Sequence, residues 1–158
     1  MKEANEMSQA EMLYAGIQLT RPLLRNITSR LEADLEGTGI GVGERAVLEV
    51  LLAVGQATAP EITHILEVKR QFTGRLLKDL VERGLLQALP NPKHRTSSIF
   101  TLSDESRSLI ECIRSTELSR LGEFCQRFSP EEIRAFYEVQ RAINAEFSPA
   151  EAAISPVS

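Results

Sequence analysis

Three polar side chains recur on one side of a predicted helix in the middle of the chain. On a helical wheel of residues 69–83, Gln71, Arg75 and Lys78 lie within about 60° of one another. Leucines occupy the opposite side: Leu76, Leu77 and Leu80. Glutamine can pair with an adenine edge and arginine with guanine or a phosphate, in a major groove that admits one helix. Taken alone, the pattern fits contact with double-stranded DNA and an ordinary amphipathic helix equally well.

Neighbouring residues extend this candidate surface. Lys69 and Arg70 begin the same helix and are further candidate DNA contacts. Gly74 lies on its outer side, where the missing side chain would let the backbone approach DNA, at a helix-propensity cost of roughly 1 kcal/mol. Thr58 begins a shorter helix whose first N–H groups can bind a phosphate. Phe72, at the border of the two faces, can pack at the core edge or touch a thymine methyl.

A second basic cluster follows the helix. Lys93, His94 and Arg95 lie in a polar loop between two short apolar strands, predicted over 85–89 and 98–102. An arginine at the tip of such a hairpin can enter a narrow minor groove. Bases are also common in solvated loops, so the helix and the loop together indicate DNA binding more strongly than either does alone.

The charge distribution agrees with this interpretation. The chain has a net charge of −4, but residues 67–96 hold seven bases against three acids. The bases of this segment are Lys69, Arg70, Arg75, Lys78, Arg83, Lys93 and Arg95. Residues 1–66 and 97–158 each carry four more acids than bases. DNA binding requires local positive charge, not a basic total; the alternative is an ordinary solvated surface.

Helix signals dominate the rest of the chain. Capping boxes predict helix starts at Ser8, Thr58 and Ser129, and Gly84 is a predicted left-handed helix end. Pro22 predicts a kink or break near residues 19–21. The glycines of 37–43 follow a helix and not a strand, which favours a flexible loop over a phosphate-binding loop.

These elements predict a mainly α protein with a small β-wing: a winged helix-turn-helix domain plus a terminal-helix dimerisation domain. The long apolar helices at both ends exceed what one small domain can cover, and such surface usually marks an interface. The predicted parts are an N-terminal dimerisation helix (1–36), the DNA-binding domain (43–103), C-terminal dimerisation helices (104–147) and a flexible tail (148–158).

The stretch APEITHILEVKRQFTGRLLKDLVERGLLQALPNPKHRTSSIFTLSDES resembles the winged-helix core of MarR-type transcriptional regulators. The matching features are the helix end over 80–85, Asn91-Pro92 before the wing tip, and Leu102-Ser103 before the next helix. The resemblance implies an obligate homodimer with entwined terminal helices, binding to pseudo-palindromic operators, and relief of repression by small ligands or oxidants.

The wing departs from the family's pattern. His94 stands where the family usually has aspartate, Thr96 replaces a second arginine, Ser103 a threonine and Ser106 a glycine. The Asp–Arg pair that commonly braces the wing is therefore absent. The departure predicts a more mobile wing with weaker minor-groove anchoring by Arg95.

Other classes of function find little support in the sequence. We expect no metal, no cofactor and no enzymatic activity, because no nucleophile–base pair, metal-ligand spacing or phosphate loop is present. No apolar run approaches a membrane span, and the start lacks a signal peptide, so a cytoplasmic location is expected. Cys112 and Cys125 are expected to be buried inert thiols; a cross-dimer disulfide is the alternative.

The sequence therefore predicts a dimeric, sequence-specific DNA-binding regulator, a repressor released by a small-molecule ligand. The alternative is a winged-helix interaction module that has lost sequence-specific DNA binding, which the altered wing and acidic flanks favour. Loss of binding with added salt separates the two.

Overall fold

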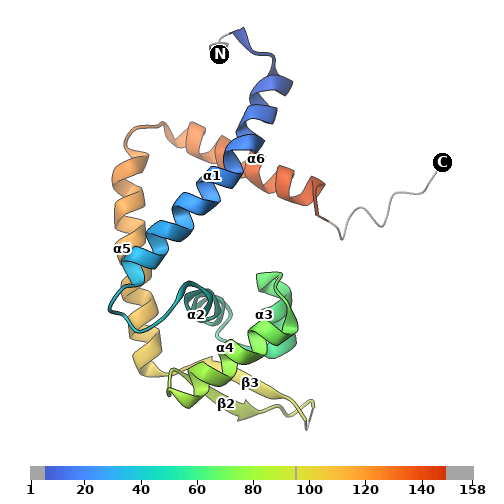
Figure 1. The fold of residues 1–158 in the computed structure, drawn as a ribbon, viewed down its shortest axis with the longest axis vertical. Helices are drawn as coiled ribbons and strands as arrows, with labels where there is room; N and C mark the ends of the chain where they lie inside the picture. The colour runs from blue at the N-terminus through green and yellow to red at the C-terminus, as the bar shows by residue number, and fades with distance from the viewer. Residues whose placement is uncertain (1–5, 95, 149–158) are drawn as a thin grey trace, which may run out of the picture. The chain divides into compact units, whose positions relative to one another are not determined.

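The computed structural model describes residues 6–94 and 96–148, most of which are helical. Figure 1 shows the chain. Its elements are α1 (Gln9–Leu35), α2 (Val42–Val54), β1 (Gln56–Thr58), α3 (Ala59–Leu66), α4 (Arg70–Glu82), β2 (Leu86–Pro90), β3 (Ser98–Leu102), α5 (Asp104–Cys125) and α6 (Pro130–Glu146). They form two compact units, which divide within α5 between Ile110 and Glu111.

Capping boxes begin three helices, as the sequence predicts. Ser8 caps α1, Thr58 caps α3 and Ser129 caps α6. In each, the hydroxyl accepts the N–H of a glutamate three residues later, and that glutamate's carboxylate accepts the N–H of the cap residue. The boxes satisfy backbone donors that a helix start otherwise leaves without partners.

Gly84 ends α4 in the left-handed conformation, with φ at +73°. The N–H of Leu85 donates to the carbonyl of Leu80 at 2.9 Å, and that of Gly84 donates to Val81 at 3.0 Å. This pair of bonds is a Schellman motif, which closes the helix and reverses the chain. The predicted end of α4 is confirmed, and the chain passes directly into β2.

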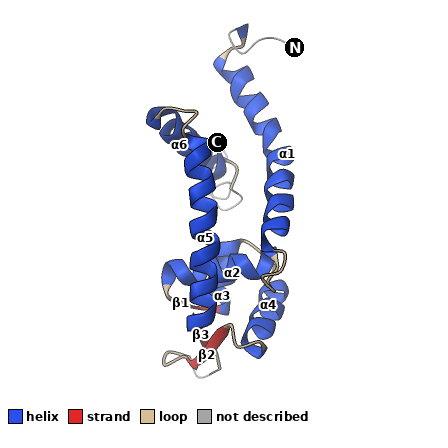
Figure 2. Ribbon diagram, turned by 90° about the vertical axis from the view of Figure 1, so that its left-hand side faces the viewer, coloured by secondary structure: helices blue, strands red, loops and turns tan. Residues whose placement is uncertain are grey.

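The three strands form one antiparallel sheet in the order β1–β3–β2 (Figure 2). β3 has its predicted bounds, and β2 begins one residue later than predicted. β1, whose Ala57 pairs with Phe100, was not predicted from the sequence. Three residues are too few to show a strand's alternation, and β1 depends on a partner more than forty positions away.

The core lies between α2, α3, α4 and the sheet. Fully buried side chains come from each helix and from the start of α5: Leu48 and Leu51, Ile62, Leu80, and Ile110. Leu77 of α4 is buried beside them. This core fixes which face of α4 points inward, and it therefore fixes which face is left for solvent.

Two predictions near α1 differ from the helix bounds. Pro22 does not break the helix, because α1 is continuous from Gln9 to Leu35, and the alternative of a kink stays a prediction. Proline removes one hydrogen bond of the ladder, and a helix of 27 residues has several turns on each side to continue it. The predicted glycine loop also ends early, since α2 begins at Val42 and includes Gly43.

Helices outside this core leave much apolar surface uncovered. In α1 only Leu35 is buried, and α6 buries none of its residues. No helix in the described part of the chain has an apolar stretch long enough to cross a membrane.

Candidate nucleic-acid interface

The outer face of α4 holds the predicted helix contacts together. Gln71, Arg75 and Lys78 are exposed, while Leu77 and Leu80 are buried on the opposite side. Arg75 forms no ion pair within residues 6–94 and 96–148. Its guanidinium is therefore available for a guanine edge or a phosphate.

Lys78 has a partner on its own helix. Its Nζ lies 3.7 Å from a carboxylate oxygen of Glu82, and both side chains are largely exposed. An exposed pair at this spacing is weak and is screened by salt. A phosphate could therefore displace Glu82 with little loss of stability.

The turn before α4 presents Lys69 and Arg70. Glu67 adopts the left-handed conformation, with φ at 52°, and ends α3. Lys69 is the N-cap of α4, and its carbonyl accepts the N–H groups of Phe72 and Thr73. Both basic side chains are exposed, and no acidic residue lies in the first turn of the helix. A short turn thus joins two packed helices, which is a helix-turn-helix.

Thr58 is less available than the other predicted contacts. Its backbone N–H donates to a carboxylate oxygen of Glu61 at 2.7 Å, and its hydroxyl donates to the same oxygen at 2.8 Å. These bonds, the backbone one first, lower the pKa of Glu61, and the charge of Lys93 lowers it further. A carboxylate therefore already occupies part of the anion site that the sequence predicts at this helix start.

The wing loop has an internal brace that the sequence analysis did not find. The side-chain oxygen of Asn91 accepts the N–H of Lys93 at 3.0 Å, and its side-chain nitrogen donates to the hydroxyl of Ser97 at 2.8 Å. The N–H of Ser97 also donates to the carbonyl of His94 at 3.1 Å. Asn91 is buried, and its two hydrogen bonds connect the two sides of the loop. This chain therefore has a brace at the wing although the Asp–Arg pair that the resemblance implies is absent.

The bases of the wing are only partly described. Lys93 and His94 are exposed at the tip, as predicted. Arg95, the predicted minor-groove residue, lies outside the described residues. Its role stays a prediction.

One of the seven bases in the positive segment faces the protein. The guanidinium of Arg83 contacts Asp79 at 2.8 Å and Glu44 at 2.7 Å, and it donates to the carbonyl of Gly39. Arg83 was expected to belong to the positive surface, but its charge is paired with the carboxylates of Glu44 and Asp79. The hydrogen bond to Asp79 is the largest cause that raises the pKa of Arg83, and the same bond lowers the pKa of Asp79.

Ser103 and Ser106, at the start of α5, stand where the resemblance implies a threonine and a glycine, and they bond to each other. The Ser103 hydroxyl accepts the N–H of Ser106 at 3.2 Å, which caps the helix. The Ser106 hydroxyl is fully buried and donates to the carbonyl of Ser103 at 3.2 Å. The substitution of serine for glycine is therefore accommodated without an unsatisfied hydroxyl.

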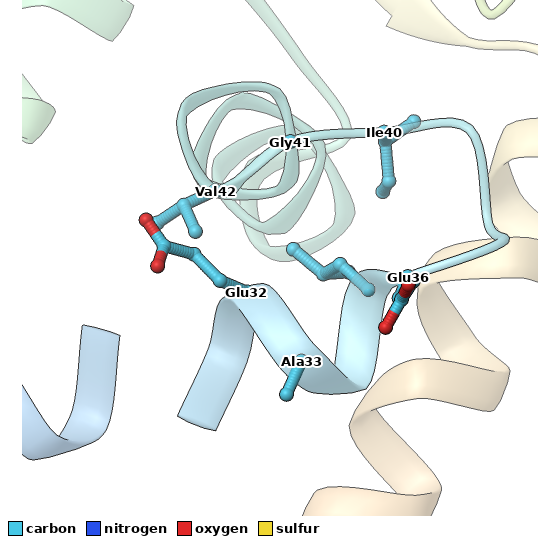
Figure 3. Close-up of a pocket in the computed structure, with 7 residues that line it drawn as sticks. Glu32, Ala33, Glu36, Ile40, Gly41 and Val42 are labelled. Carbon is cyan, nitrogen blue, oxygen red and sulfur yellow. The ribbon is translucent and has the colours of Figure 1, made fainter. Parts of the chain in front are cut away.

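A cavity of about 420 Å³ lies where α1 meets α2 (Figure 3). Glu32 and Glu36 line it, together with the buried Leu35 and Ile40. Its other lining residues are Ala33, Gly41 and Val42. The cavity combines an apolar floor with two carboxylates, which is a common pattern in sites for small molecules.

The cysteines are not both buried. Cys112 is exposed in the single chain, Cys125 is half-buried, and both are free thiols. Cys112 is therefore not buried within the single chain, and its burial in the expected dimer stays a prediction. No group of three metal-binding side chains occurs among the residues that the structure describes.

Comparison with known sequences gives a match over the winged-helix segment. The family model for the MarR family matches residues 38–95. The uncharacterized protein Rv2011c of Mycobacterium tuberculosis is 38% identical over 56 residues. That match covers 35% of this chain and 39% of the mycobacterial protein.

Comparison with solved structures extends over nearly the whole chain. The MarR family transcription regulator SP03579 is 36% identical, with a TM-score of 0.83, and the match covers 94% of this chain and 97% of that one. The Staphylococcus aureus MepR–DNA complex has a TM-score of 0.73 at 16% identity, covering 83% and 96% of the two chains. A mutant MarR from Escherichia coli complexed with operator DNA has a TM-score of 0.71 at 17% identity, covering 87% and 99%. The last two show likeness of fold alone.

Proposed function

Because the chain belongs to the MarR family of transcription regulators, we propose that it binds pseudo-palindromic operator DNA as a homodimer in the cytoplasm. We propose further that it represses transcription until a small molecule releases it. The observation that carries the proposal is the outer face of α4, where Gln71 and Arg75 are exposed while the leucines behind them are buried. A helix whose inward face packs against the core in this way can place its outward face in a major groove.

Each exposed side chain of α4 has a chemically distinct role in this proposal. Gln71 pairs with an adenine edge, and Arg75 binds a guanine bidentately or clamps a phosphate. Lys78, with Lys69 and Arg70 at the start of the helix, neutralises phosphates. The base contacts provide specificity, and the phosphate contacts provide affinity and register.

The wing adds contacts beside the helix. The brace by Asn91 supports this role, because it restricts the backbone that carries Lys93. In the proposal Lys93 and His94 contact the backbone of the DNA, and Arg95 enters the minor groove. Fixing the loop before binding reduces the entropy that binding must remove.

Uncovered apolar surface supports the dimer. In α6, Phe136 is 62% exposed, Tyr137 59% and Phe147 71%. In α1, Leu19 and Leu24 are both more than 60% exposed. Water-exposed rings and leucines on two separate helices are unfavourable in a monomer and are typical of a covered interface. We propose that 1–36 and 104–147 form this interface and that 43–103 bind DNA.

The cavity between α1 and α2 supports ligand control. Its carboxylates, Glu32 and Glu36, favour a small molecule that carries a cation or hydrogen-bond donors on an apolar body. The cavity wall includes Ile40 and Gly41, in the loop that leads into the winged helix. A ligand that fits the cavity in only one state of the protein would shift the population of the DNA-binding state.

Selection of bound sites from random double-stranded DNA tests the proposal. The expected result is two inverted half-sites with centres about 10 base pairs apart. The affinity for the selected site should fall steeply between roughly 50 and 200 mM salt. Arg75→Ala should weaken it. Arg134→Ala is the matched control, because this exposed arginine lies on the polar side of α6, opposite Phe136.

The same experiment tests the interaction module as the alternative function. The altered wing, with His94 and Thr96 in place of an acid and an arginine, is the observation that favours it. Selection that enriches no sequence, together with weak binding that is the same for every DNA, would support that module and exclude the proposed regulator.

A further inference from the structure

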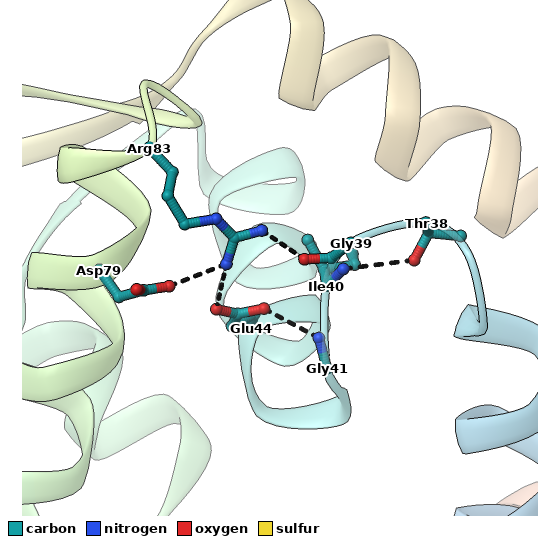
Figure 4. Close-up of polar contacts among 7 residues, drawn as sticks. All are labelled: Thr38, Gly39, Ile40, Gly41, Glu44, Asp79 and Arg83. Carbon is teal, nitrogen blue, oxygen red and sulfur yellow. Dashed lines mark hydrogen bonds and ion pairs between the residues drawn. The ribbon is translucent and has the colours of Figure 1, made fainter.

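Arg83, at the C-terminal end of α4, joins three segments of the chain (Figure 4). Its guanidinium contacts Asp79 on its own helix, Glu44 in the first turn of α2, and the carbonyl of Gly39 in the loop before α2. The contacts with Glu44 and Gly39 span 39 and 44 positions of sequence. One side chain thus connects the end of α4 to the loop between α1 and α2.

Glu44 extends this connection with its second oxygen. Oε1 accepts from Arg83 at 2.7 Å, while Oε2 accepts the N–H of Gly41 at 2.8 Å. Glu44 therefore caps α2 and binds Arg83 at the same time. The three side chains Arg83, Glu44 and Asp79 form a cluster that we call the α4 clamp.

One side of the clamp is shielded from water, and the other is open to it. The side chain of Glu44 is 15% exposed, that of Arg83 is 36% exposed and that of Asp79 is 51% exposed. Ion pairs weaken mainly through solvent and salt, and their networks are stronger when partly buried. A planar guanidinium can donate to several acceptors in fixed directions, which a lysine cannot do.

A second contact between α2 and α4 lies nearer the start of α4. A Cβ at Gly43 would lie 3.1 Å from Cζ of Phe72 and 3.3 Å from a methyl of Leu76. The absence of a side chain at Gly43 therefore lets the Phe72 ring lie close to α2. In addition to its buried leucines, α4 thus contacts α2 through Phe72 near its start and through Arg83 at its end.

We propose that Arg83 is a positioning residue for DNA recognition: through the α4 clamp it fixes α4 against α2, so that Gln71 and Arg75 meet base edges together. This inference rests on the proposed function. It assigns Arg83 a role different from that of the exposed bases, since the contacts of its guanidinium are with the protein and not with phosphate. Without the clamp, α4 keeps the packing of Phe72 and of its buried leucines but loses the charged contact between its C-terminal end and α2.

The two roles differ in the salt dependence of binding. Loss of a phosphate contact reduces the slope of log affinity against log salt by roughly 0.9. Loss of a positioning residue weakens operator binding with the slope unchanged, and it leaves non-specific binding nearly intact. A change of roughly tenfold in operator affinity is expected, as for other residues that act without touching the ligand.

The experiment compares four full-length proteins on the selected operator and on random DNA: wild type, Arg83→Ala, Glu44→Gln and the double variant. Glutamine keeps an oxygen for the N–H of Gly41, so Glu44→Gln removes the charge without removing the cap. Each single variant should lose roughly tenfold in operator affinity with the wild-type slope. The double variant should lose no more than either single one, because both changes break the same interaction.

Several outcomes would overturn the inference. Operator binding by Arg83→Ala that equals that of wild type would show that Arg83 does not position α4. A reduced slope with equally weakened non-specific binding would show that Arg83 is a phosphate contact. Losses that add in the double variant would also contradict it. If Arg83→Ala does not fold, as judged by circular dichroism, Glu44→Gln alone gives the affinity and slope. A wild type that binds no DNA overturns the proposed function itself, which is a different result.

Discussion

At the scale of single residues, the molecule separates its bases into two groups. Arg75 is exposed and makes no ion pair within the described residues, whereas Arg83 faces Glu44 and Asp79. The sequence cannot distinguish them, because both are arginines on one helix in one positive segment. Exposure and partner contacts decide which of them can meet DNA.

Gln71→Ala and Arg75→Ala should affect binding differently from Lys78→Ala. A side chain that reads a base contributes about 1–3 kcal/mol and sets the preference at one position. We expect Gln71→Ala and Arg75→Ala to weaken operator binding and to relax specificity at one base pair of each half-site. Lys78→Ala should weaken binding to all sequences and reduce the salt slope. Titration of operator variants by fluorescence anisotropy measures both effects; unchanged base preference in Gln71→Ala and Arg75→Ala would argue against base readout.

At the scale of elements, the sequence predicts what depends on neighbouring residues. Helix starts at Ser8, Thr58 and Ser129 and the helix end at Gly84 are local hydrogen-bond patterns, and all four are confirmed. β1 was missed because its stability comes from pairing with distant β3.

The candidate site divides along the same line. The inward and outward faces of α4 follow from its helical period. The structure confirms them, because the predicted polar face is exposed and Leu77 and Leu80 are buried. The contacts of Arg83 with Glu44 and Gly39 could not be predicted, because they join positions about forty residues apart. The part of the brace that Asn91 makes with the N–H of Lys93 could have been predicted from the sequence, since asparagine often bonds to the backbone two residues later.

Gly74→Ala should separate stability from function in α4. A Cβ at Gly74 would meet no atom within 4 Å, and this glycine lies in the interior of a helix. Replacement by alanine should therefore raise the free energy of unfolding by about 1 kcal/mol. Because the added methyl faces the predicted DNA surface, operator affinity should fall. Denaturant unfolding and DNA titration on one preparation check both parts, and an affinity equal to that of wild type would exclude close backbone approach at Gly74.

The capping box of α3 should make stability depend on acid. Glu61 has a folded-state pKa below its ordinary value of 4.5, so its ionised form stabilises the folded state. That contribution is complete above the unfolded-state pKa and is lost as pH falls through the lower folded-state pKa. Thermal unfolding should show wild type more stable than Glu61→Gln at neutral pH, with the difference shrinking below pH 4.5. A constant difference across this range would mean that the charge does not contribute.

At the scale of the whole molecule, the acidic total and the basic centre serve one proposed purpose. Acidic flanks repel DNA, and the seven bases of 67–96 are reduced to six once Arg83 is assigned to the clamp. A surface this small gives one subunit few phosphate contacts. Two subunits on one operator double the contacts without a second free association, which is why a dimer suits so small a positive surface.

The dimer predicts that a change far from the DNA surface should abolish operator binding. Phe136 of α6 is 62% exposed in the single chain, so Phe136→Glu should leave the fold of the chain intact and place a charge in the proposed interface. Sedimentation should show a monomer, and operator affinity should fall to the level of a single half-site. Ala145→Glu adds the same charge at an exposed position nine residues further along, on the opposite side of α6, and is the matched control. A Phe136→Glu protein that stays dimeric would show that Phe136 lies outside the dimer interface. A monomeric Phe136→Glu protein that binds the full operator like wild type would show that operator binding does not require the dimer.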